Sequence, residues 1–336
     1  MRFVAVILFL VGTFSFGQRS DFNIEFNQAD SIALKYKDAS LNNLPVLVHN
    51  LTTGLNTEAE KFRSIYTWVC SNIENDYGAY QKTVKKRKKL LANPKALTEW
   101  NNSFTPKVFE KLLKQRKTAC TGYAFLIREL ATLADINCQI INGYGRTPTL
   151  ILDKNSIPNH SWNSVELNGK WYLCDPTWSA GRIILEEDGP RFKPDYFDGY
   201  FLADPVIFAK NHLPLKREWC LLEEPPTFQQ FLEGPVVYKN AFASNIIPIA
   251  PSKMNLKVTK NEKLSFLFSV PETYNCENLT IKLGNGPNGK LYEPSLTREQ
   301  NLCRLEYSFE KSGLFDMHIL ADESIIATYV VKVKRK

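Results

Sequence analysis

The strongest constraint on the fold is a hairpin signal in residues 159–178. Asn168-Gly169 separates two strand-like runs, and this dipeptide favours the two-residue type I′ turn. Such a turn fixes the strand register, so Trp162 is predicted to face Asp175. His160 shares a face with Trp162, which places Asp175 diagonally beside His160, with backbones roughly 7–8 Å apart. A slip by one residue would separate the two side chains, so the pair depends on this register.

The chain before this hairpin reads mainly as helices. Residues 18–115 contain a clear example at 58–73, where apolar residues recur at helical spacing and Thr57 is the predicted N-cap. A second apolar stripe covers residues 120–135, and residues 138–143 read as the next strand. We therefore expect an α+β core in which helices pack on an antiparallel sheet.

The chain after the hairpin changes character twice. Residues 190–232 are rich in aromatics and broken by prolines, which predicts short helices and loops wrapped on the core. From about residue 246, short alternating runs are separated by turn residues, which predicts a β-sandwich. The expected organisation is a core domain with its aromatic-rich extension at 18–244 and an Ig-like β-sandwich at 245–336.

The first residues have the pattern of a secretory signal peptide, predicted at 1–17. Met1-Arg2 gives a positive start, residues 3–16 are almost wholly apolar, and Ser15 and Gly17 are small residues before a cut at Gln18. The apolar run is shorter than the roughly 20 residues that span a bilayer. We expect a secreted or periplasmic protein in a compartment that permits disulfides, with no integral membrane segment once the leader is removed.

Charge and cysteine counts limit the function classes. The 336 residues include 42 Lys+Arg and 35 Asp+Glu, a net charge of +7 that is too weak to indicate nucleic acid as a partner. Residues 82–89 (KTVKKRKK) concentrate six of the positive charges. This run is either a solvated face or an anionic binding surface. The seven cysteines are an odd number, so at least one lies outside any intramolecular disulfide.

Cys120 is the candidate nucleophile. It heads the predicted helix 120–135, where backbone N–H groups favour a negative charge, and Gly122 leaves room beside it. His160 is the candidate base, and Asp175 is the group that would orient it. The alternatives are an inert buried thiol, a structural histidine, and an aspartate that binds the turn before Pro176.

The remaining cysteines and histidines give no second site. His49 and His212 lie in segments without a partner pattern and are interpreted as surface or core residues, and His318 falls within a predicted strand. No CxxC, HExxH or phosphate-binding loop occurs, so neither a metal nor a cofactor is expected. Three further cysteines are predicted to be structural, and the pairing of two more stays open: Cys70, Cys138 and Cys174, then Cys276 and Cys303.

Three segments together resemble the transglutaminase-like (papain-related) superfamily. They are residues 118–124 (TACTGYA), 160–163 (HSWN) and 171–178 (WYLCDPTW). Their order, a cysteine on a helix followed by a histidine and an aspartate on successive strands, is that of the family core. Residues 200–222 are similar to the kyphoscoliosis-peptidase branch of the family.

The resemblance implies a role for each residue. Cys120 would attack an amide or acyl carbonyl, His160 would act as base and then acid, and Asp175 would orient His160. The backbone N–H of Cys120 would help to hold the oxyanion.

Two functions follow from these patterns. The first is a secreted cysteine peptidase, amidase or acyltransferase that acts on protein or peptide amides through a thioester, with a cell-wall peptide as one substrate to consider. The second is a non-catalytic protein-binding module that keeps the fold and uses the C-terminal domain or the basic run to contact a partner in the cell envelope.

Overall fold

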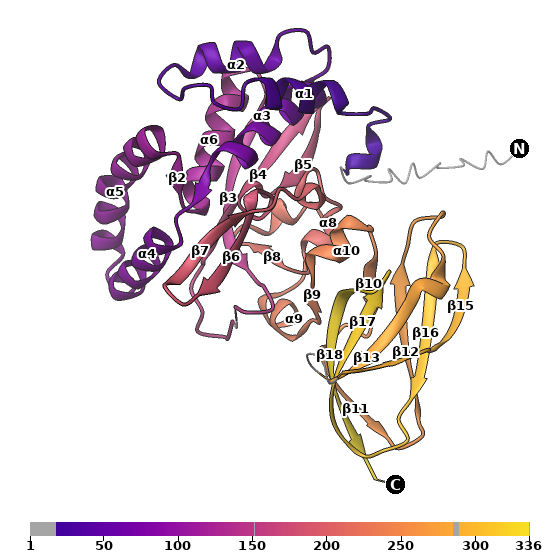
Figure 1. The fold of residues 1–336 in the computed structure, drawn as a ribbon. Coiled ribbons are helices and arrows are strands. Elements are labelled where there is room, and N and C mark those ends of the chain that lie inside the picture. The colour runs from indigo at the N-terminus through magenta and orange to yellow at the C-terminus, as the bar shows by residue number, and fades with distance from the viewer. Residues whose placement is uncertain (1–17, 151, 285–288, 336) are drawn as a thin grey trace, which may run out of the picture.

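The computed structural model describes residues 18–150, 152–284 and 289–335, so the predicted leader at 1–17 lies outside the described residues. The chain forms a helix-and-sheet part followed by a β-sandwich that ends at the C-terminus (Figure 1). This arrangement confirms the predicted α+β class. Among the described helices, none has the length and apolar character needed to cross a membrane.

Six helices build the first part of the chain. They are α1 (Asn27–Lys35), α2 (Leu44–Thr52), α3 (Glu58–Asn72), α4 (Tyr77–Leu90), α5 (Pro94–Gln115) and α6 (Cys120–Leu133), after a short 3-10 turn, η1 (Arg19–Asp21). The predicted cap of α3 is present, because the Thr57 hydroxyl accepts the Glu60 N–H at 3.2 Å. The Glu60 carboxylate accepts the Thr57 N–H at 3.0 Å in return. Each side chain thus accepts a backbone N–H that would otherwise be unpaired at the helix start.

A buried arginine ties α3 to its surroundings. Arg63 is only 3% exposed. Its Nε and Nη2 atoms donate to the two carboxylate oxygens of Asp30 on α1 at 2.6 and 2.8 Å. Arg63 also forms an ion pair with Asp198. This network joins the first helix to a segment that follows the central hairpin.

The central sheet is antiparallel, with the strand order β5-β4-β3-β8. Its members are β3 (Cys138–Gly145), β4 (His160–Leu167), β5 (Lys170–Cys174) and β8 (His212–Pro214). The predicted register is confirmed, because Leu167 pairs with Lys170 and Asn163 pairs with Cys174. Asn168 and Gly169 have φ angles of 52° and 75°, the left-handed values that a type I′ turn requires.

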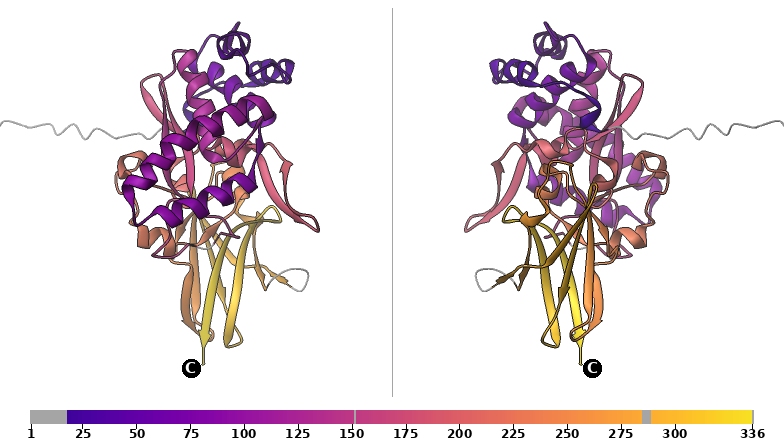
Figure 2. Two further views of the ribbon diagram at one scale, coloured as in Figure 1. Left: turned by 90° about the vertical axis from the view of Figure 1, so that its left-hand side faces the viewer. Right: turned by 90° about the vertical axis from the view of Figure 1, so that its right-hand side faces the viewer.

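Helices α4 and α5 form an arm that leaves the core and returns to it. Strand β1 (Glu74–Asn75) precedes the arm and strand β2 (Lys117–Thr118) follows it. The two strands pair in parallel, with Asn75 opposite Thr118. Figure 2, left, views the arm from outside the molecule. Because β2 leads directly into α6, the base of the arm fixes the start of that helix.

The segment after the central hairpin differs in part from its prediction. A hairpin of β6 (Gly181–Glu186) and β7 (Gly189–Pro194) enters the region expected to hold only short helices and loops. Strand β8 also lies in this region, so the prediction of helices and loops alone is wrong at two places. The other elements between the central hairpin and the sandwich are short. They are α7 (Pro176–Ala180), η2 (Asp198–Tyr200), α8 (Pro205–Phe208), η3 (Arg217–Cys220), α9 (Phe228–Glu233), β9 (Val236–Val237) and α10 (Lys239–Ala243).

The C-terminal region contains two sheets. One has the order β10-β12-β16-β15 and the other β11-β18-β17-β13-β14. The strands are β10 (Ile247–Ala250), β11 (Asn255–Thr259), β12 (Lys263–Ser269), β13 (Leu279–Leu283), β14 (Lys290–Tyr292), β15 (Ser295–Glu299), β16 (Leu302–Ser308), β17 (Gly313–Ala321) and β18 (Ser324–Lys334). Cys276, in the short turn η4 (Cys276–Asn278), forms a disulfide with Cys303 of β16.

The sandwich and the helix-and-sheet part share buried contacts. β9 pairs with β18 through Val237 opposite Ala327 and Val236 opposite Thr328. One continuous hydrophobic cluster contains Trp162 of the central sheet together with residues of the sandwich interior. The two parts are therefore joined both by backbone hydrogen bonds and by apolar packing.

Candidate active site

Cys120 is the first residue of α6, as predicted. The residue before it, Ala119, occupies the N-cap position and offers no side-chain acceptor to the helix. Close packing against β2 requires a glycine in the first turn, because a Cβ at Gly122 would lie 1.9 Å from the Thr118 hydroxyl oxygen. The sequence therefore holds the start of α6 tightly against the base of the arm and leaves its first backbone N–H groups without side-chain caps.

His160 and Asp175 meet as the hairpin register predicts. His160 begins β4, and its Nε2 lies 2.6 Å from Asp175 Oδ2. Asp175 is one residue beyond the end of β5 and is fully buried. Its other carboxylate oxygen caps α7 by accepting the N–H groups of Thr177 at 2.8 Å and Trp178 at 3.2 Å. The two interpretations of Asp175, partner of His160 and ligand of the following turn, are both present.

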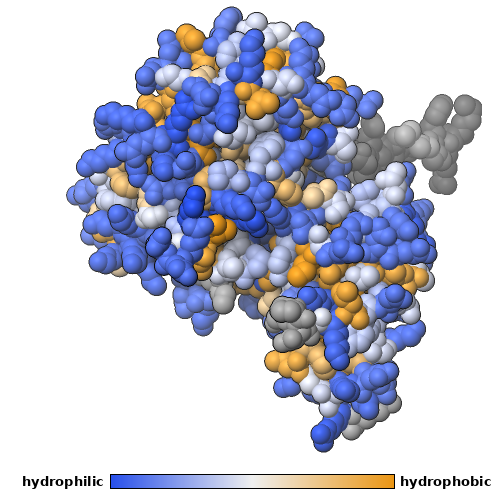
Figure 3. Space-filling model, viewed as in Figure 1, coloured by the Kyte–Doolittle hydropathy of each residue, from blue (hydrophilic) through white to orange (hydrophobic). Residues whose placement is uncertain are grey.

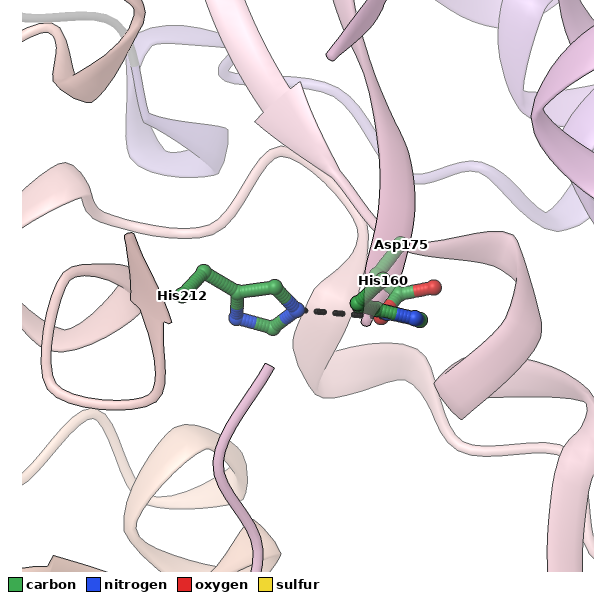
Figure 4. Close-up of side chains that lie close together, drawn as sticks. All are labelled: His160, Asp175 and His212. Carbon is green, nitrogen blue, oxygen red and sulfur yellow. Dashed lines mark hydrogen bonds and ion pairs between the residues drawn. The ribbon is translucent and has the colours of Figure 1, made fainter. Parts of the chain in front are cut away.

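A second histidine lies on the same carboxylate. His212 of β8 places its Nε2 3.0 Å from Asp175 Oδ2 (Figure 4). Its ring stacks on Phe208 with the ring centres 3.9 Å apart. The sequence interpretation of His212 as a surface or core residue missed this contact. The available signal was its place in residues 200–222, the segment that resembles a branch of the family.

The electrostatics of the group favour a charged pair. Burial opposes the thiolate of Cys120, but the hydrogen bond and charge of His160, with the Ser161 backbone N–H, hold the pKa of Cys120 below its ordinary value. Burial also opposes the imidazolium of His160, yet Asp175 and Cys120 raise the pKa of His160 to about 10. The two imidazoles lower the pKa of Asp175 despite its burial.

His212 has the opposite tendency. Its burial lowers its pKa to about 4, although Asp175 attracts a proton to it. At neutral pH one imidazole is therefore protonated and the other neutral. Because the Nε2 of His160 is bound to Asp175, the Nδ1 of His160 is the nitrogen left for Cys120. The site thus combines a thiol of lowered pKa with an imidazole of raised pKa, a carboxylate of lowered pKa and a second imidazole of lowered pKa.

Three of these side chains form a donor set that a metal ion could use: His160, Asp175 and His212. The distances of 2.6 and 3.0 Å from the two Nε2 atoms to one oxygen are those of direct hydrogen bonds. A shared ion would need all three atoms to turn toward one point about 2.0–2.2 Å from each of them. We therefore interpret the cluster as a hydrogen-bonded group.

The other cysteines differ from Cys120. Burial raises the pKa of four free thiols, in each case as the largest effect: Cys70, Cys138, Cys174 and Cys220. With the disulfide between Cys276 and Cys303, the seven cysteines comprise one pair and five free thiols. Cys120 alone among the free thiols has a lowered pKa. Of the remaining histidines, His49 is exposed on α2 and His318 binds Thr328 in the sandwich.

Comparison with known proteins agrees with this geometry. Residues 46–176, which hold all three predicted site residues, match the family model described as the Transglutaminase-like superfamily. The protein carries a transglutaminase-like domain. The chain is 30% identical to human kyphoscoliosis peptidase over 222 residues, which are 66% of this chain and 30% of the human protein. The mouse kyphoscoliosis peptidase is 29% identical over 262 residues, covering 74% of this chain and 36% of the mouse protein.

A relative with a different name also matches. Hillarin of Drosophila melanogaster is 27% identical over 225 residues, which are 64% of this chain and 25% of Hillarin. The matched regions thus span only about a quarter to a third of these relatives. The similarity identifies the shared domain, and the names of the relatives describe those proteins.

Proposed function

We propose that this protein is a transglutaminase-like cysteine enzyme that cleaves or transfers protein or peptide amide groups through a thioester on Cys120. The observation that carries the proposal is the connected group of Cys120, His160 and Asp175, in which the pKa of Cys120 is lowered and the pKa of His160 is raised. Such a pair supplies both a nucleophile and an acid at neutral pH.

The proposed reaction begins with attack of the Cys120 thiolate on the amide carbonyl carbon. The carbonyl electrons move to oxygen, and in this proposal the backbone N–H of Cys120, at the uncapped start of α6, stabilises the oxyanion. The Nδ1–H of His160 then protonates the amide nitrogen as the C–N bond breaks. The products of this half are a free amine, a thioester and a neutral His160.

The second half reverses the proton transfer. Water or an amine attacks the thioester carbonyl, and Nδ1 of His160 takes the proton of the attacking group. The C–S bond breaks, and the thiolate and imidazolium return. Water gives hydrolysis and an amine gives transamidation, and both use the same residues. Asp175 stays ionised throughout and keeps the His160 ring oriented.

We also propose that the enzyme is secreted or periplasmic, on the basis of the leader pattern in residues 1–17. A disulfide between Cys276 and Cys303 agrees with an oxidising compartment. The expected partner is a protein or peptide substrate, and the sandwich is the proposed contact with the cell envelope.

The test is selective alkylation of Cys120. Iodoacetamide at pH 6.5 should modify Cys120 rapidly, and Cys120→Ala should abolish the modification seen by intact mass and peptide mapping. Cys220→Ala is the matched control, since it removes a free buried thiol whose pKa is raised to about 11. Equal, slow modification of the wild type and Cys120→Ala would contradict the enzyme proposal and favour the non-catalytic binding module.

A further inference from the structure

A cavity of about 370 Å³ lies between α4, α5 and the start of α6. Ala119, Thr121 and Gly122, the residues on either side of Cys120, form one of its walls. The residues packed around His212 and Trp162 enclose no comparable space. The arm cavity therefore offers space next to Cys120, between its neighbours on α6 and the arm.

The interior of this arm cavity is apolar. Phe104, Val108 and Phe109 of α5 and Phe125 of α6 line it. The rings of Phe109 and Phe125 meet edge to face with their centres 4.4 Å apart. A volume of this size holds one large aliphatic or aromatic side chain with room for its backbone. Thr118, also in the wall, has a buried hydroxyl without a hydrogen-bond partner among the described residues.

The rim of the arm cavity is strongly basic. Five cationic side chains line it against one carboxylate, Asp76: Lys82, Arg87, Lys107, Lys111 and Lys117. Two of these charges are compensated, because Lys111 pairs with Asp76 and Lys117 lies 2.7 Å from Glu74. Lys82, Arg87 and Lys107 have no carboxylate partner in the described part of the chain. The surface over α4 and α5 is mostly hydrophilic (Figure 3), which agrees with an open charged rim.

We propose that the arm cavity is a substrate-binding site for an acidic peptide segment that carries one large apolar side chain. The apolar side chain occupies the space between α5 and α6, and flanking carboxylates bind Lys82, Arg87 and Lys107. This placement brings a backbone or side-chain amide of the segment to Cys120. The inference rests on the proposed function for that last step and names its substrate class.

The basic run in residues 82–89 thereby gains a role. The sequence left open whether it is a solvated face or an anionic binding surface. Two of its six charges, Lys82 and Arg87, line the arm cavity, and these two favour the second interpretation. A peptide is favoured over a nucleic acid because the cavity interior is apolar and adjoins a nucleophile. Charge attraction at the exposed rim also implies that binding weakens as salt increases.

The experiment measures peptide binding by fluorescence anisotropy with the full-length Cys120→Ala variant, which cannot react. Three labelled peptides are compared: Glu-Glu-Phe-Glu-Glu, its Ala-for-Phe analogue, and Lys-Lys-Phe-Lys-Lys. The first should bind most tightly. Reversal of the rim charges in Lys82→Glu/Arg87→Glu/Lys107→Glu should weaken its binding on the order of tenfold, from three exposed charge contacts.

The matched control reverses three exposed charges in the sandwich, Lys257→Glu/Lys260→Glu/Lys332→Glu, and should leave binding unchanged. Val108→Trp fills the arm cavity and should remove the preference for Phe over Ala. Equal binding of the acidic and basic peptides, equal effects of the two triple variants, or tighter binding of a twelve-residue oligothymidylate would each overturn the inference.

Failure of the proposed function is distinguishable from failure of this site. An inert Cys120 with selective binding of the acidic peptide would contradict the catalytic proposal and leave the arm cavity as a peptide-binding site. A reactive Cys120 with no selectivity among the peptides would leave the catalytic proposal and refute the site.

Discussion

Replacement of Asp175 by asparagine tests the proposed pairing of Cys120 and His160. An amide oxygen can still accept the backbone N–H groups that begin α7, so the helix cap should persist. The amide nitrogen would then donate to Nε2 of His160, which becomes an acceptor. The remaining ring proton moves to Nδ1, the nitrogen that serves Cys120, and His160 can no longer take a proton there.

The magnitude follows from the thiolate fraction. At pH 6.5 an ordinary thiol with a pKa near 8.5 is about 1% ionised, whereas a thiolate paired with an imidazolium is almost fully ionised. Alkylation of Cys120 at this pH should therefore fall by up to about 100-fold in Asp175→Asn. The lower intrinsic nucleophilicity of a low-pKa thiolate reduces this ratio, so about tenfold is the smallest loss expected.

Folding stability should change with pH in a defined window. The raised pKa of His160 contributes stability below its unfolded value of 6.5, and this contribution is lost as pH rises through about 10. The lowered pKa of Asp175 contributes stability above 3.8, and this contribution is lost as pH falls through the lower folded value. The wild type should exceed Asp175→Asn most clearly between about pH 4 and 6.5.

The assay is the rate of iodoacetamide modification of Cys120 from pH 5.5 to 10, followed by intact mass. Asp204→Asn is the matched control, because Asp204 caps α8 through the Val206 N–H at 2.7 Å and touches no imidazole. The control should keep the wild-type profile. A wild-type rate at pH 6.5 in Asp175→Asn would refute the reasoning.

Three further substitutions test the fold around the site. Gly122→Ala should lower the free energy of unfolding, measured in urea, by about 1–3 kcal/mol, because the added methyl group clashes with Thr118 of β2. Gly78→Ala is the control and should not destabilise the protein, because its methyl group would make only an ordinary contact at 3.6 Å. Arg63→Met should lower the free energy of unfolding by about 2–4 kcal/mol, because it removes the buried partner of Asp30 and Asp198. The two carboxylates stay partly in water, which limits the loss. An unchanged urea midpoint would contradict this. Removing the disulfide in Cys276→Ala/Cys303→Ala, a sequence separation of 27, should cost about 3–4 kcal/mol, and reduced wild type should match the double variant.

The part of the site that the sequence predicted depends on short-range rules. Asn168-Gly169 fixed the register, and the alternation of faces brought Asp175 to His160. Asp175 is nevertheless not a ladder residue, because Pro176 cannot donate to a sheet and the chain turns into α7. The strand ends at Cys174, one residue earlier than predicted. The alternation of side-chain faces nevertheless continues to Asp175, so the predicted contact with His160 is present.

The part that was missed depends on long-range pairing. His212 reaches Asp175 because β8 pairs with β3, and no local pattern near His212 predicts that partner. The hairpin of β6 and β7 had a local signal in Asp188-Gly189, but the aromatic and proline content of the segment favoured loops. The shape of the arm cavity arises from two helices that meet α6, which residue spacing alone does not reveal.

The pairing of β9 with β18 has a consequence for how the protein is made. Val236 and Val237 can pair only after Ala327 and Thr328 of β18 have been synthesised, about 90 residues later in the chain. The chain must therefore be synthesised through residue 328 before this joint beside the central sheet can close. A chain truncated within the sandwich would expose apolar residues of the helix-and-sheet part that share one hydrophobic cluster with the sandwich. The two parts should therefore complete their folding together, when β18 pairs with β9.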